Sequence, residues 1–180
     1  VTTLFWGVGA TLQFTVLGWA HDTLGLPLAQ AAYLQGVVAL GVVAGAALAG
    51  RLVPLHQAKR VLPAGVVLGL LISTVAITHS LWLALPLLVL VGLVGGILVV
   101  PMNALLQHRG HQLLTAGRSI AVQGYNENLS ILVMLASYAG LLALNAPIVP
   151  LMTGFGLVIA TAMAALLIFK RGLLHARAAA

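Results

Sequence analysis

Six long apolar stretches dominate this sequence and limit what it can fold into. Each is close to the roughly 20 residues that a helix needs to cross the hydrocarbon core of a bilayer. Only short connectors separate the stretches, and none shows the alternation that membrane barrels require. The pattern therefore predicts an all-α integral membrane protein of six transmembrane helices, at residues 3–20, 29–52, 61–78, 82–106, 119–144 and 147–169.

The composition supports a lipid environment. Hydrophobic residues make up 62% of the chain and charged residues only 6%, whereas a soluble domain carries about 25% charged residues. A net charge of +6 could suit nucleic acid in a soluble protein. Here the basic residues lie beside short connectors, so we expect membrane lipids as partners and no nucleic acid.

All eight Lys and Arg residues fall on one side of the predicted six-span arrangement. They lie beside the second and fourth connectors or after the last span, at Arg51, Lys59, Arg60, Arg109, Arg118, Lys170, Arg171 and Arg177. The positive-inside rule assigns this side to the cytoplasm, so both ends of the segment are expected there. Trp6, Trp19 and Trp82 lie at span ends, where indole rings favour the membrane interface.

Three glycine pairs have the GxxxG spacing that allows helix backbones to approach closely. They are Gly41 with Gly45, Gly65 with Gly69, and Gly92 with Gly96. A dimer interface and packing within one bundle both fit this spacing. Because the chain has 20 glycines, such pairs also arise by chance, which favours packing within the bundle.

Glu127 is the acidic residue that lies inside an apolar span. It sits about 12 Å into its predicted helix, and a charge at mid-bilayer costs about 2.5–3.5 kcal/mol even on insertion scales. Spacings of three and four predict one polar stripe, formed by Ser119, Gln123, Glu127, Ser130, Met134 and Tyr138. Glu127 then either belongs to a substrate or ion site, or is a protonated structural residue bonded to a neighbouring helix.

The distribution of amides predicts which spans line a cavity. Spans three and six carry nothing more polar than Ser or Thr, whereas spans one, four and five carry amides and Glu127. The candidate substrate-binding residues are Glu127, Gln123, Asn126, Gln13, Asn103 and Ser130. For Gln13, a structural hydrogen bond between helices fits equally well.

Pro101 lies inside the fourth span, where it removes a backbone hydrogen bond and clashes with the carbonyl of Ile97. This favours a kink, which either gates a pathway or is tolerated as part of the helix shape. Asn103 follows two residues later. It could satisfy freed backbone groups or line the pathway.

Motifs for enzyme chemistry are missing from the sequence. Gly7-Val8-Gly9 lacks the third glycine and the strand context of a dinucleotide site. There is no Gly-x-Ser-x-Gly elbow. His108 and His111 lie in a basic segment without a neighbouring carboxylate, and the chain has no cysteine. We therefore expect no enzymatic activity, no cofactor and no metal.

Two segments resemble signatures of bacterial lysophospholipid transporters of the major facilitator superfamily. They are VVPMNALLQHRG at residues 99–110 and AGRSIAVQGYNEN at residues 116–128. A third segment, LFWGVGATLQF at residues 4–14, is similar to the start of the seventh helix in that family. The resemblance covers nearly the whole chain and implies that residues 1–180 are helices seven to twelve, the C-terminal half of a longer protein.

The resemblance also implies a function and partners. Such proteins move lysophospholipids from the outer to the inner leaflet of the bacterial inner membrane, and a cytoplasmic acyltransferase then re-acylates them. The N-terminal six-helix half would be the intramolecular partner. Glu127 matches an acidic position of the eleventh helix in the family, and Gln13 stands where some members have arginine.

The candidate gating residues are Pro101, Arg51 and Arg118. Gly50 stands directly before Arg51, at a position where the superfamily usually has aspartate. Two alternatives to the lysolipid transporter remain open. The chain could be another major facilitator porter, for drugs or small solutes, or the membrane half of a transporter–acyltransferase fusion.

Overall fold

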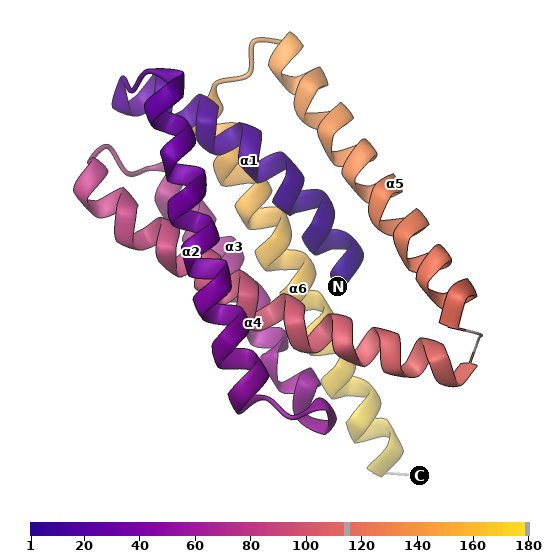
Figure 1. The fold of residues 1–180 in the computed structure, drawn as a ribbon. Coiled ribbons are helices and arrows are strands. Elements are labelled where there is room, and N and C mark those ends of the chain that lie inside the picture. Colours follow the sequence, from indigo (N-terminus) through magenta and orange to yellow (C-terminus); the bar gives the residue numbers. More distant parts are fainter. Residues whose placement is uncertain (114–115, 179–180) are drawn as a thin grey trace.

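The structure is a computed structural model that describes the backbone of residues 1–113 and 116–178 and the side chains of residues 1–112 and 117–169. Within these ranges the chain is all-helical, as predicted (Figure 1). The elements are α1 (Thr2–Leu24), α2 (Leu28–Leu52), the 3₁₀ helix η1 (Leu55–Val61), α3 (Leu62–Ala76), α4 (Leu81–Leu113), α5 (Ala116–Ala143) and α6 (Ile148–Ala178).

Helix boundaries differ most from prediction at the end of α4. The segment 107–118 was expected as a connector, yet α4 continues to Leu113 and α5 begins at Ala116. Residues such as Gln107 and Arg109 end the hydrophobic run without ending the helix, because long polar side chains have good helix propensity. The hydrophobic run therefore ends before the helix does.

Among the described residues, four of the six predicted spans correspond to helical segments that are long and apolar enough to cross a membrane. They are Leu28–Leu52, Leu55–Ala76, Leu81–Gln112 and Ile148–Phe169. The remaining helices, α1 and α5, carry polar residues such as Gln13 and Glu127 along their length. Their lower hydropathy therefore reflects the polar side chains that make them candidates for the functional face.

Glycines bring α2 against α4 within the bundle. A Cβ atom on Gly45 would collide with the Leu93 carbonyl oxygen, and one on Gly92 would collide with the Val38 carbonyl oxygen. In the same way, Gly69 of α3 lies against the backbone of Gly156 in α6. The GxxxG pairs therefore serve packing within one bundle, as the sequence favoured.

Trp19 joins the end of α1 to the end of α3. Its side chain is completely buried, and its indole Nε1 donates a hydrogen bond of 3.1 Å to the Ala76 carbonyl oxygen. Ala76 is the last residue of α3, where carbonyls lack partners within the helix. Trp19 is thus enclosed between helix ends, whereas Trp6 and Trp82 are exposed.

The bundle has two distinct ends. Figure 1 shows that α2, α4 and α6 finish at one end, while the α1–α2, α3–α4 and α5–α6 connectors lie at the other. Arg51, Arg60, Arg109 and Arg118 belong to the first end, as the charge pattern predicts. The side chains of Lys170, Arg171 and Arg177 lie outside the described residues.

Candidate substrate-binding site

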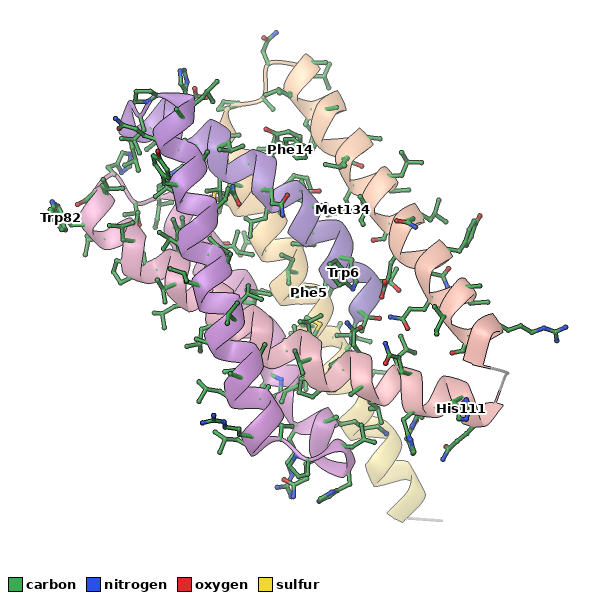
Figure 2. The ribbon with its side chains drawn as sticks, viewed as in Figure 1. Phe5, Trp6, Phe14, Trp82, His111 and Met134 are labelled. Atoms are coloured by element: carbon green, nitrogen blue, oxygen red, sulfur yellow. The ribbon has the colours of Figure 1, made fainter. Side chains whose placement is uncertain are left out.

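The polar stripe on α5 faces α1. Its six members, from Ser119 to Tyr138, are all half-buried. Residues on the other faces of α5 are exposed, including Tyr125 at 69% and Leu132 at 65%. Packing of α5 against α1 explains this difference, and Figure 2 shows Met134 in the space between the two helices. The predicted spacing of three and four thus corresponds to one real helix face.

Within the stripe, Gln123 orients the carboxylate of Glu127. The Gln123 Nε2 atom donates a hydrogen bond of 2.9 Å to Glu127 Oε1, one helical turn away. Among the described residues, no basic side chain forms an ion pair with Glu127. A half-buried carboxylate of this kind can accept a hydrogen bond from a ligand ammonium group or carry a proton.

Gly7 lets α5 approach α1 beside this carboxylate. A Cβ atom at Gly7 would collide with Ser130 Oγ and would lie 3.0 Å from Met134 Cγ. Near the start of α5, Ser119 Oγ similarly lies against Gly110 of α4. The two segments that carry the family resemblance therefore meet at Gly110 and Ser119.

The bundle encloses a large cavity. Its volume is about 910 Å³, and its walls come mainly from α1, α2 and α4. Apolar side chains cover most of the wall, and among the described side chains that line it none is charged. The amides at its surface are Gln13 and Gln35. From α5, Ile131 reaches the cavity, four residues after Glu127, so the carboxylate lies about one turn from its edge.

Gln35 is a cavity residue that the sequence analysis missed. Its Nε2 atom donates a hydrogen bond of 2.7 Å to the backbone carbonyl oxygen of Gln13. The available signal was an amide inside the second apolar span, where a polar group needs a partner. The sequence analysis predicted that spans one, four and five line the cavity. It did not include the second span, although α2 supplies one wall of the cavity.

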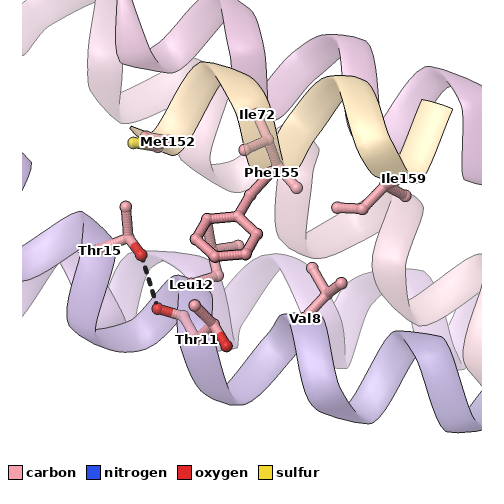
Figure 3. Close-up of a pocket in the computed structure, with 8 residues that line it drawn as sticks. All are labelled: Val8, Thr11, Leu12, Thr15, Ile72, Met152, Phe155 and Ile159. Carbon is pink, nitrogen blue, oxygen red and sulfur yellow. Dashed lines mark hydrogen bonds between the residues drawn. The ribbon is translucent and has the colours of Figure 1, made fainter. Parts of the chain in front are cut away.

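A second cavity, between α1, α3 and α6, is too small for a ligand (Figure 3). Its volume is about 10 Å³, roughly the space for a single water molecule. The Thr11 and Thr15 hydroxyls donate to the carbonyl oxygens of Gly7 and Thr11, at 3.0 and 2.8 Å. Because both hydroxyls donate within α1, they leave the wall of this cavity effectively apolar.

The other candidate residues occupy separate places. Asn126 is exposed on α5, away from the stripe, and Arg51 and Arg118 are exposed at helix ends. Pro101 is buried in α4, whose C-terminal part swings toward the start of α5 (Figure 1). The Asn103 Oδ1 atom is buried and has no hydrogen-bond partner among the described residues.

Together these features define a multi-pass membrane protein whose polar stripe lies beside an apolar cavity. The hydrogen-bonded carboxylate of Glu127 and the mostly apolar wall of the cavity thus lie about one helical turn apart. The cavity volume falls within the range of about 300–1,000 Å³ that is usual for ligand pockets. A membrane-embedded carrier is the class of protein that this combination describes.

Comparison with known proteins specifies the class further. The chain is a homologue of the lysophospholipid transporter LplT: it is 43% identical over 171 residues to LplT of Shigella flexneri and to LplT of Escherichia coli K12. The match covers 94% of this chain and 43% of each relative, so the chain spans less than half the length of these curated relatives. No protein-family model and no solved structure matches the chain. Its relatives are thus transporters rather than enzymes.

Proposed function

We propose that residues 1–180 form the C-terminal six-helix half of a transporter that moves lysophospholipids from the outer to the inner leaflet of the bacterial inner membrane. The observation that carries this proposal is the 43% identity over 94% of the chain to transporters more than twice its length. The match covers 43% of the length of each relative, which agrees with one half of a protein built from two six-helix units.

The geometry of the site supports an amphiphilic substrate. A single acyl chain lies in the apolar cavity between α1, α2 and α4, and the polar headgroup lies toward Gln123, Glu127 and Ser130 on α5. An ammonium headgroup binds the Glu127 carboxylate directly, or Glu127 carries a proton that orders the site. Either role gives a reason for an acidic group in a membrane helix, where its cost otherwise goes uncompensated.

Movement of the substrate requires a second half. Transporters of this architecture rock one unit against the other around a site near the midplane. Pro101 in α4 and the basic ends at Arg51 and Arg118 are where this half would change its contacts. A cytoplasmic acyltransferase would use the delivered lysolipid, since the product arrives in the inner leaflet with a free hydroxyl.

Uptake of labelled palmitoyl lysophosphatidylethanolamine by cells that lack other lysolipid uptake tests the function. The full-length protein that contains this chain is expected to restore uptake and conversion to the diacyl lipid. Expression of residues 1–180 with and without the remaining segment tests the two-half arrangement. No uptake by the full-length protein would overturn the function, and full uptake by residues 1–180 alone would overturn the arrangement.

Orientation is tested separately. From the distribution of basic residues, we expect the ends of α2, α4 and α6 to lie in the cytoplasm. A small tag in the connector at Asn145 should then be labelled from outside the inner membrane, and a tag after Ala180 only from inside. Labelling of both tags from the same side would refute this topology.

A further inference from the structure

The two amides of the large cavity lie together at one of its ends. On α1 the wall runs from Val1 to Val16, with Gln13 near its end, and on α2 it begins at Gln35. The two helices are antiparallel and joined by a short connector (Figure 1). Both amides therefore lie at the end of the cavity nearest this connector, and the remainder of the wall is mostly apolar.

Gln35 is held in place but keeps free hydrogen-bonding capacity. One of its two amide hydrogens bonds to the Gln13 carbonyl oxygen at 2.7 Å. Among the described residues, neither its Oε1 atom nor the Gln13 side chain makes a further hydrogen bond. An amide offers two donors and one acceptor oxygen, so the pair presents both kinds of group to whatever occupies the cavity.

The chemistry of the wall selects the part of a lipid that binds here. No charged side chain among the described residues lines the cavity, so a phosphate or ammonium has no counter-ion there. The pair instead matches a neutral group that both donates and accepts a hydrogen bond, which describes a hydroxyl. A lysophospholipid has one such hydroxyl on its glycerol, whereas the diacyl parent has an ester, which accepts only.

We propose that Gln35, positioned by its bond to the Gln13 carbonyl, binds the free glycerol hydroxyl of the substrate and thereby selects lysophospholipids over diacyl phospholipids. This inference rests on the proposed transport function. The acyl chain lies along the apolar wall of the same cavity. A second acyl chain in place of the hydroxyl leaves the Gln35 Oε1 atom without a donor, which is unfavourable in an apolar site.

The test compares two labelled substrates in the full-length protein. One is palmitoyl lysophosphatidylethanolamine, and the other is the same molecule without the glycerol hydroxyl. The native protein should take up the hydroxyl form about 3- to 10-fold faster, the factor expected for one hydrogen bond. The Gln35→Leu variant should take up both forms at the slower rate. Gln30→Leu, on an exposed part of α2 outside the cavity, should keep the native preference.

The outcomes separate the two hypotheses. If the native protein takes up neither lipid, the transport function itself fails. If it takes up both equally, or if Gln35→Leu keeps the preference or slows both forms by the same factor, the assignment of Gln35 is overturned while transport stands. The Gln35→Met variant has a side chain of similar length without the amide, and it should give the same result as Gln35→Leu. Agreement between the two variants shows that the result does not come from misfolding of one of them.

Discussion

Two parts of this bundle are joined in different ways. Between α2 and α4, glycines place backbone against backbone, so that a Cβ atom on Gly45 would meet the main chain of Leu93. Between α1 and α5, the nearest atom to a Cβ on Gly7 is the Ser130 side-chain oxygen, followed by Met134 Cγ and the Ser130 carbonyl oxygen, both at 3.0 Å. Main-chain atoms cannot move aside without shifting a helix, whereas side chains can change rotamer.

This difference assigns different roles to the two parts. The α2–α4 and α3–α6 pairs form a closely packed scaffold, whereas α5 stands apart from the other helices and packs mainly on α1 (Figure 1). The candidate carboxylate lies on this less constrained helix. Rigid-body shifts of a helix are a common element of conformational change, so we expect α5 to shift more readily than the scaffold helices.

The largest expected effect is on transport and comes from α5. We expect Glu127→Ala to abolish lysolipid uptake, because it removes the charge and the hydrogen-bonding group of the stripe. Thermal stability in detergent should be unchanged, since the hydrogen bond found for Glu127 is to Gln123 on the same helix. Ser137→Ala, at an exposed site on α5, is the matched control. Normal uptake by a stable Glu127→Ala protein would remove Glu127 from the site.

Glu127→Gln refines this test. It keeps the shape and the hydrogen bond with Gln123 while removing the charge. If the carboxylate binds an ammonium group, uptake should fall strongly even though the protein folds normally. Full activity of Glu127→Gln together with lower stability of Glu127→Ala would indicate a structural residue instead.

The largest effect on stability should come from the scaffold. Gly45→Ala places a Cβ atom against the Leu93 main chain, and overpacking of this kind costs about 1–3 kcal/mol. Gly50→Ala is the matched control on α2, because no atom lies within 4 Å of its new Cβ. Unfolding of purified variants in detergent should separate the two. Equal stability of the two variants would show that α2 and α4 do not pack as closely as described.

Loss of the Trp19 hydrogen bond should have a somewhat smaller effect. Trp19→Phe leaves the Ala76 carbonyl oxygen buried without its donor. An unsatisfied buried group of this kind lowers the free energy of unfolding by about 1–3 kcal/mol, and partial repacking should reduce this loss. Trp82→Phe provides the control, since Trp82 is 83% exposed and projects from the start of α4 away from the bundle (Figure 2). A lower melting temperature for Trp82→Phe than for Trp19→Phe would contradict the burial of Trp19.

The smallest effect is expected where α1 meets α5. Gly7→Ala forces Ser130 and Met134 to adjust. We expect the free energy of unfolding to fall by about 1 kcal/mol, which is the lower limit of the usual cost of overpacking. Ser130→Ala removes the nearest side-chain oxygen and should restore part of this loss in the double variant. A double-mutant cycle on unfolding free energies measures this coupling. Purely additive effects would show that the two residues do not touch.

The sequence by itself determined the helices and the direction of the polar stripe. Both follow from local periodicity, because hydrophobic length sets a span and a repeat of three to four residues sets a helix face. Glu127, Gln123 and Ser130 were therefore found as neighbours without knowledge of the fold. Their role in binding remains a proposal.

Only the tertiary structure decided which residues meet between helices. Gln35 and Gln13 come together, and Trp19 is buried against Ala76, because of how the helices are arranged in space. Nothing in the local pattern distinguishes Trp19 from Trp82, since both are tryptophans close to the end of a predicted span. Contacts between helices depend on crossing geometry and close approach at small residues, which one-dimensional hydropathy does not record.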